Sequence, residues 1–308
     1  MTIVEIGKMN DEQAREYLEN IRWPNDPVCP HCQGTNVTRL KGEAHRPGMI
    51  QCNAKECRGQ FTVTVGGVME SSHIPLVKWA MGFHMLSSSK KGMSALQLQR
   101  NLGLGSYRTA WFMCHRIRCA MEGQPVQQKM TGVVESDETY IGGKPKRNSG
   151  KRGRGTKKQP VMVLVQRDGA AVSMPVPNVT IKTVRRELNL HVSKSAILMT
   201  DEHSAYIKPG QRFKEHDTVN HGTDEYARRR DDGLVVHVNS CESFFALMKR
   251  GHHGIYHSWS KKHMHRYCSE FGFRWTHRKT TDTERTEVAI QQAEGKRLLY
   301  KNPCEKSA

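Results

Sequence analysis

The sequence lacks any apolar run long enough to cross a bilayer, and its opening residues, MTIVEIGKMNDEQAREY, do not form a signal peptide. A membrane-spanning or exported protein is therefore not expected. Without an export signal, the chain and its nine cysteines should lie in a reducing compartment. There, grouped cysteines bind metal more often than they form disulfides. We expect a cytoplasmic protein.

Acidic residues are also in short supply. Asp and Glu number 30 against 48 Lys and Arg, which gives the chain a formal charge of +18. Such an imbalance favours a polyanionic partner, because each phosphate that a cation neutralises releases condensed counterions. Nucleic acid is the first candidate and an anionic membrane the second. A charge of +18 exceeds what solubility alone requires.

The chain has no internal repeat, and its 308 residues suffice for more than one domain. Its patterning divides it into a helix and cysteine-rich segment (1–67), a helical segment (68–125), an α/β segment (130–280) and a polar tail (281–308). Strands are predicted at 132–142, 160–166 and 196–201, and helices at 10–20, 180–191, 260–276 and from residue 239 onward.

Four cysteines form two pairs in the N-terminal part of the chain: Cys29, Cys32, Cys52 and Cys57. Two such pairs, separated by a spacer long enough for a strand, match a structural Zn²⁺ ribbon with four thiolate ligands. The second pair has four intervening residues and is less diagnostic than the first. His31 and His45 are alternative ligands, although His31 sits inside the first turn and should be exposed. Four thiolates leave no open coordination position, so this zinc should be structural.

The stretch GMSALQLQRNLGLGSYRTAWFMCHRIR has the form of a helix–turn–helix with a glycine-containing turn. Ser106 can cap the second helix, and Arg108, Arg116 and Arg118 give that helix a basic aspect that suits a DNA major groove. A plain helical hairpin fits the spacing about as well. The neighbouring cysteine pairs and the overall charge favour DNA binding.

Two aspartates lie on predicted strands, Asp137 within VVESDETYI and Asp201 at the end of AILMTD. A carboxylate on an apolar strand is costly to bury unless it is paired or binds a cation. Carboxylates are natural Mg²⁺ ligands, and two carboxylate-bridged metals can promote phosphodiester transfer. That chemistry needs a third ligand, for which Glu242 is the candidate. Each aspartate taken alone would more often be a turn or strand-end residue.

Glu242 has a competing interpretation. Asn239 followed three residues later by Glu242 fits a helix capping box, in which the Glu side chain reaches back to the cap. Asn239 could also be a ligand through its amide oxygen. The nearby acids Glu135, Glu138 and Glu202 have the opposite strand phase and could face solvent, and His221 could approach the site or lie on the surface.

A basic loop follows the first of these strands. Residues 144–158 contain no acid and eight basic residues: Lys144, Lys146, Arg147, Lys151, Arg152, Arg154, Lys157 and Lys158. The loop should follow a DNA backbone or, alternatively, be a flexible solvated loop.

The order of these features resembles that of the DDE-type transposases of bacterial insertion sequences. The resemblance covers roughly residues 15–280 and depends most on ESDETYIGGK (135–144), TDEHSAY (200–206), VNSCESFFALMKRGHHGIYH (238–257) and HRYCSEFGFRW (265–275). It implies an RNase H-like catalytic domain at 130–280, preceded by a zinc ribbon and a helix–turn–helix segment.

The resemblance assigns the family's two aspartates to Asp137 and Asp201. Lys249 stands seven residues after Glu242, where many members carry a basic residue that can contact a phosphate, and this favours Glu242. Related subgroups are described with Asn as the third residue, which keeps Asn239 as the alternative. Phe245 stands where the family usually has Trp.

The implied activity is cleavage of DNA at the ends of the element and transfer to a target. The implied cofactors are two Mg²⁺ (or Mn²⁺) ions at the catalytic site and one structural Zn²⁺. The implied partner is DNA, bound by a homo-oligomer in the bacterial cytoplasm, with no covalent protein–DNA intermediate. Two alternatives remain: a zinc-ribbon, helix–turn–helix regulator without catalysis, and an RNase H-like nuclease without strand transfer.

Overall fold

The computed structural model describes residues 1–123, 128–142 and 158–300. The chain divides into two compact units: unit 1 comprises Met1–Glu122 and Thr280–Ala308, and unit 2 comprises Gly123–Lys279. Within the described ranges, no helix is long and apolar enough to span a bilayer.

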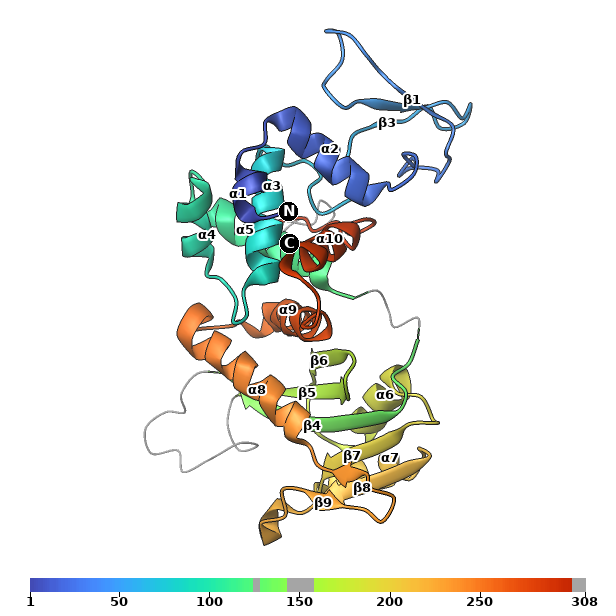
Figure 1. Ribbon diagram of the computed structural model, residues 1–308, viewed down its shortest axis with the longest axis vertical. Helices are drawn as coiled ribbons and strands as arrows, with labels where there is room; N and C mark the ends of the chain where they lie inside the picture. Colours follow the sequence, from blue (N-terminus) through green and yellow to red (C-terminus); the bar gives the residue numbers. More distant parts are fainter. Residues whose placement is uncertain (124–127, 143–157, 301–308) are drawn as a thin grey trace, which may run out of the picture. The chain divides into compact units, whose positions relative to one another are not determined.

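Unit 2 is built on a five-stranded mixed sheet with the order β6-β5-β4-β7-β8 (Figure 1). Its strands are β4 (Val133–Ile141), β5 (Gln159–Gln166), β6 (Ala171–Pro175), β7 (Ile197–Asp201) and β8 (Glu215–Val219). The first three form an antiparallel meander, whereas β7 and β8 run parallel to β4. Parallel strands need crossover connections, and helices supply them on both sides of β7.

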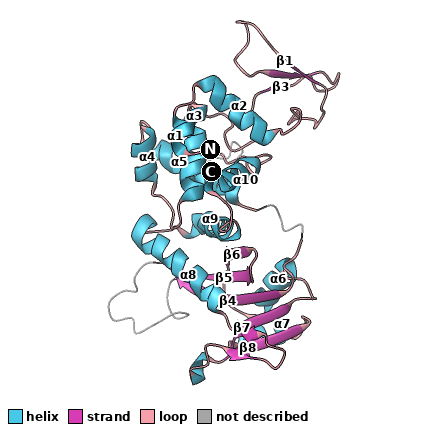
Figure 2. Cartoon of the chain, viewed as in Figure 1, coloured by secondary structure: helices cyan, strands magenta, loops and turns pink. Residues whose placement is uncertain are grey.

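Helices cover both faces of this sheet (Figure 2). The helices are α6 (Ile181–His191), α7 (Ser204–Gly210), α8 (Asn239–Gly251) and α9 (Met264–Thr276). Met162 and Leu164 of β5 face the core under α6 and α7. The alternate residues Val161, Val163 and Val165 face the core under α8 and α9. The continuous apolar run of β5 therefore reflects a strand that is buried on both faces.

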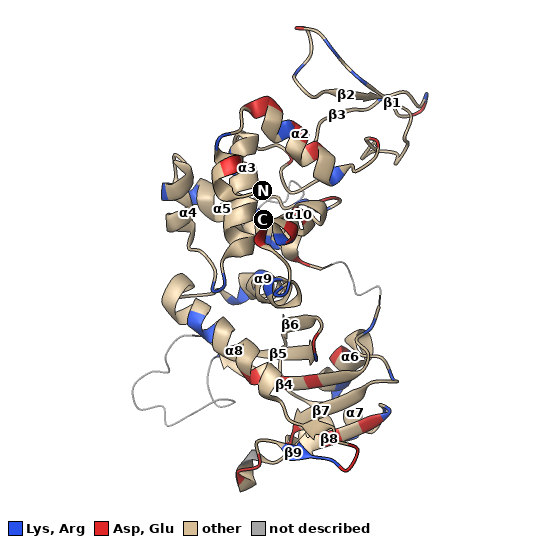
Figure 3. Cartoon of the chain, in the orientation of Figure 1, with Lys and Arg blue, Asp and Glu red and all other residues tan. Residues whose placement is uncertain are grey.

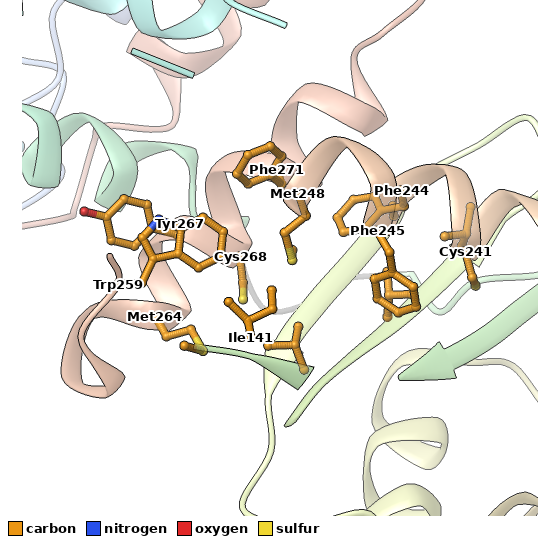
Figure 4. Packing of buried hydrophobic residues seen from close by; sticks show 14 residues of the cluster. Ile141, Cys241, Phe244, Phe245, Met248, Trp259, Met264, Tyr267, Cys268 and Phe271 are labelled. Carbon is orange, nitrogen blue, oxygen red and sulfur yellow. The ribbon is translucent and has the colours of Figure 1, made fainter. Parts of the chain in front are cut away.

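The core under α8 and α9 contains many aromatic residues. Phe245 and Met248 point from α8 towards the strands, with Ile141 of β4 among their neighbours (Figure 4). α9 packs so closely against β6 that a Cβ atom at Gly272 would lie 3.0 Å from the carbonyl oxygen of Ala171. This packing fixes α8 and α9 against the sheet edge that carries the meander.

Short elements complete unit 2. They are η2 (His221–Thr223), β9 (Arg228–Arg229), β10 (Val235–Val236), the π-helical turn η3 (His252–Tyr256) and η4 (Lys261–His263). β9 and β10 pair as an antiparallel ribbon within the stretch that leads from β8 to α8. The observed unit is the mixed α/β sheet flanked by helices that the resemblance implied, and this fold class is confirmed.

Unit 1 combines a small sheet with a group of helices. Its elements are α1 (Ile3–Gly7), α2 (Asp11–Arg22), β1 (Val37–Arg39), β2 (Ile50–Cys52), β3 (Gln60–Phe61), α3 (Leu76–Ser88), α4 (Ala95–Leu102), α5 (Tyr107–Met121) and α10 (Asp282–Gln291). Asn10 caps α2 with a capping box. Between α4 and α5, Gly103 adopts a left-handed φ of 56°, and Ser106 caps α5 as predicted.

The C-terminal segment differs from the polar tail expected at 281–308. Helix α10 packs against α3 and α2, with Ala289 and Ile290 buried. The Arg285 guanidinium donates to the carbonyl of Ser87 at 3.2 Å. The segment looks polar because one narrow face of α10 supplies its buried contacts.

Candidate active site and zinc site

Asp137 and Asp201 lie next to each other on the sheet. β4 and β7 pair in parallel, and their register, continued two residues beyond the pair of Glu135 and Met199, sets these aspartates side by side. Val134 and Leu198 belong to the core under α6 and α7. Alternation along the strands therefore places both aspartates on the other face, the one that α8 covers. The structure brings together the two acids that the sequence selected.

Backbone donors orient both carboxylates. Oδ1 of Asp137 accepts the N–H of Glu138 at 2.7 Å, and Oδ1 of Asp201 accepts the N–H of His203 at 3.1 Å.

The surroundings of Asp137 raise the pKa of its carboxyl group. The pKa of Asp137 is raised to about 7, chiefly by burial. The negative charges of Asp201, Glu138 and Glu242 also raise it, whereas the hydrogen bond from the N–H of Glu138 lowers it. Half-buried acids that repel one another are stabilised by a cation placed between them. The carboxylate oxygens available here are the hard ligands that Mg²⁺ and Mn²⁺ take.

Glu242 lies in the first turn of α8, which packs on β4, and Figure 3 shows acidic segments on both elements. The expected capping box is absent: Val238 is the N-cap residue of α8, and no side chain caps it. Asn239 is the first helical residue, and its N–H donates to Nδ1 of His237 at 3.3 Å. The capping interpretation of Glu242 is therefore wrong.

A buried carboxylate from β4 satisfies the start of α8 instead. Glu135 is fully buried and accepts hydrogen bonds from the backbone N–H of Ser240 at 2.8 Å and from its hydroxyl at 3.0 Å. Nε of Arg167 donates to the same carboxylate at 2.7 Å. The Arg167 guanidinium also donates to the carbonyls of Val235 and His237, just before α8. Glu135 and Arg167 thus attach the start of α8 to the sheet.

Glu135 and Glu138 correct the expectation that the neighbouring acids face solvent. Glu135 lies two residues before Asp137 and so shares its face, which the spacing itself could have indicated. Glu138 faces the other side, where the Tyr206 hydroxyl donates to it at 3.0 Å. Its side chain is only 6% exposed. Glu202 alone is exposed, as expected.

The predicted DNA-contacting residues are placed unequally. Lys249 is exposed in the last turn of α8, and Lys158 is partly buried at the start of β5. Arg108 is exposed on unit 1, but Arg116 is only 7% exposed and Arg118 only 2%. The basic aspect expected of α5 is therefore confined to its first turn. The remainder of the basic loop, residues 144–157, lies outside the described residues, and of His221 only the backbone is described, in η2.

The four cysteines of unit 1 converge on one point. Their sulfur atoms all lie within 4.8 Å of one another, with 3.7 Å between Cys29 and Cys57 and 3.6 Å between Cys32 and Cys52. Sulfurs at the corners of a tetrahedron with Zn–S bonds of about 2.3 Å would be about 3.8 Å apart. In the described part of the chain, this is the one group of three or more candidate ligands gathered so closely. The site fits Zn²⁺.

Two similar turns present these thiols. Gln33 after Cys32 and Arg58 after Cys57 both adopt a left-handed φ, of 61° and 48°. A glycine follows each of them in the sequence. The alternative ligand His31 is exposed and lies against the second turn, 2.6 Å from where a Cβ at Gly59 would be. Neither His31 nor His45 belongs to the ligand group.

Comparison with known proteins agrees with this arrangement. The model of the ISXO2-like transposase domain matches residues 129–276, and that of the transposase zinc-ribbon domain matches residues 9–60. An uncharacterized protein in transposable element ISH50 of Halobacterium salinarum is 29% identical over 285 residues, which cover 86% of this chain and 91% of that protein. Over both matched ranges, the chain therefore belongs to the insertion-sequence transposases, with an N-terminal transposase zinc ribbon and an ISXO2-like transposase domain.

Proposed function

We propose that the protein cleaves DNA at the ends of an insertion sequence and joins them to a target. The observation that carries this proposal is the placement of Asp137 and Asp201 side by side on one face of the sheet, close enough to Glu242 for its charge to act on Asp137. In a transposase domain, three carboxylates whose negative charges repel one another are stabilised by a bound cation. Asp137, Asp201 and Glu242 would hold two Mg²⁺ (or Mn²⁺) ions.

The residues fit such ions. All three donors are carboxylates, and Glu242 is exposed, which leaves the site open to water and substrate. When bound, the ions would supply charge stabilisation for both the attacking and the leaving oxygen of a phosphodiester. Glu242 is preferred over Asn239 because a carboxylate holds Mg²⁺ more firmly than a neutral amide oxygen does, and the charge of Glu242 reaches Asp137.

Other residues of the chain would bind and orient the substrate. Lys249 lies two turns along α8 from Glu242, about 10 Å away along the axis, and would contact a DNA phosphate. The zinc ribbon at 1–67, the helix–turn–helix at 68–125 with Arg108, and the basic loop 144–158 would bind the DNA ends. The domain at 130–280 would perform the chemistry.

Cleavage assays test this proposal. Full-length protein should cut a DNA that carries the element's ends when Mg²⁺ is added, and should cut none in EDTA. Asp137→Ala and Asp201→Ala should abolish cutting, whereas Glu202→Ala, an exposed acid beside Asp201, should leave it unchanged. Full cutting by either aspartate variant would refute the proposed metal site.

A joining assay separates transposition from simple hydrolysis. The cut 3′ end should become linked to a second, unrelated DNA in the same reaction. Cleavage without any joined product would favour a nuclease, and binding without cleavage would favour a regulator.

A further inference from the structure

Unit 1 contains a cavity of about 520 Å³ beside the helix–turn–helix. Residues 71–79 around the start of α3 form one wall, the turn 103–105 forms another, and α5 and Tyr300 complete it. The volume falls within the range of small-ligand sites, roughly 300–1,000 Å³.

The charged residues that line the cavity all have one sign. Lys78, Arg108 and Arg116 contribute to the wall, and no Asp or Glu is among the described lining residues. Three cations around one cavity favour an anionic occupant.

Arg116 is the most informative of these cations. It is 93% buried, and among the described residues its Nε has no hydrogen-bond partner. An unsatisfied buried donor on a charged group is costly. An anion in the cavity that accepts from this guanidinium would remove the cost.

The rest of the wall is aromatic. The Phe112 and Tyr300 rings lie 5.6 Å apart at 88°. The Arg116 guanidinium lies 4.7 Å from the centre of the Phe112 ring, and that of Arg108 lies 5.4 Å from the Tyr300 ring. Trp79 adds a third ring to the lining. Aromatic rings interleaved with arginines are the surface on which nucleic-acid bases stack.

We propose that this cavity binds a single unpaired nucleotide, with its base against Phe112 and Tyr300 and its phosphate on Arg116 and Arg108. The cavity opens beside the first turn of α5, the end of a second helix that approaches DNA in helix–turn–helix proteins. The nucleotide would come either from DNA with an extrahelical or terminal base or from free mononucleotide. The first source rests on the proposed DNA-binding function.

Fluorescence anisotropy with full-length protein in EDTA tests this inference without any cleavage. The probes are a blunt duplex, the same duplex with a single-nucleotide overhang, and that overhang made abasic. The overhang should bind about tenfold more tightly than the blunt duplex, and the abasic overhang should lose that gain. Direct binding of a fluorescent deoxynucleoside monophosphate, together with equal affinities for the blunt and overhanging duplexes, would support free nucleotide as the source.

Variants locate the effect. Arg116→Met, which removes the charge but keeps an apolar stem, should abolish the preference for the overhang. Tyr300→Ala should reduce it too, and because Tyr300 is 54% exposed this second variant should fold normally. Arg100→Met, on an exposed position of α4 outside the lining, is the matched control and should keep the preference.

Equal affinities for the blunt and overhanging duplexes, with no binding of the fluorescent mononucleotide, would overturn the inference. So would an undiminished preference in Tyr300→Ala, or displacement of the fluorescent mononucleotide by inorganic phosphate as readily as by unlabelled nucleotide. A protein that fails to cleave but prefers the overhang would refute the proposed catalytic function alone.

Discussion

The thiolate site of unit 1 draws its four groups from residues 29–57, whereas the carboxylate site of unit 2 draws its groups from two strands and a helix between residues 137 and 242. In the ribbon, each pair of thiols is presented by its own short turn, and the strands of the small sheet contain only two or three residues each. At the acidic site, by contrast, a packed sheet and two aromatic-rich helices exist independently of the acids.

This difference separates two uses of a metal. A ribbon with so little apolar core should depend on its ion for folding, because binding energy then becomes folding energy. At the acidic site the carboxylates repel one another within a scaffold that other contacts stabilise. The Mg²⁺ ions proposed for this site should therefore be needed for chemistry and hardly at all for folding.

Removing a thiolate should have the largest effect. Cys52→Ser should lose the zinc and unfold the cysteine turns and short strands at residues 29–61, since structural zinc contributes about 10–16 kcal/mol to comparable small domains. Metal analysis should find one zinc per wild-type chain and little in the variant, and limited proteolysis should cut the ribbon while unit 2 survives. Cys119→Ser, outside the cluster, is the control. A variant that still holds one zinc per chain would contradict the four-thiolate site.

Breaking the attachment of α8 should come next. Glu135→Gln would leave the largely buried Arg167 without its carboxylate partner and weaken the start of α8, at a cost of about 3 kcal/mol in the free energy of unfolding. Denaturant unfolding measures this cost. Cleavage should also fall, with a higher Mg²⁺ concentration needed for half-maximal activity, because Glu242 is no longer held in place. Glu202→Gln should change neither quantity, and a stability loss below about 0.5 kcal/mol in Glu135→Gln would remove the attaching role.

Neutralising Asp137 should stabilise the protein. Its pKa is about 7 in the folded chain and lower when unfolded, so the folded state binds more protons between about pH 4 and pH 7, and stability falls as pH rises through that range. Asp137→Asn should therefore gain about 4 kcal/mol at pH 8 in EDTA and nothing below pH 4. Thermal unfolding at both pH values checks this, and Mg²⁺ should stabilise only the wild type. An equal gain at both pH values would mean that charge is not the cause.

Local patterns were enough to predict the ribbon and the central strands of the sheet, but not its edge strand β8. The spacing of the cysteines reflects turns of fixed geometry, and the unbroken apolar run of β5 reflects burial on both faces, as observed. Asp137 and Asp201 could be selected because a carboxylate on such strands is conspicuous.

Features that depend on distant partners could not be predicted. The bond that satisfies the start of α8 joins Ser240 to Glu135, 105 residues earlier, so the local sequence indicated a capping box that does not form. Arg116 looked like a surface cation because its periodicity did not reveal the neighbours that bury it. For the same reason α10 looked like a tail, since its partner α3 lies about two hundred residues earlier.

The smallest effect on stability decides the third ligand. Because no side chain caps α8, Asn239→Ala should change the free energy of unfolding by less than about 0.5 kcal/mol and leave cleavage intact. Glu242→Gln, at an exposed position, should be equally mild for folding but should abolish Mg²⁺-dependent cleavage. Denaturant unfolding and cleavage measured on both variants separate the two residues. If Asn239→Ala loses cleavage while Glu242→Gln keeps it, Asn239 is the ligand and the charge of Glu242 only adds to the field at Asp137.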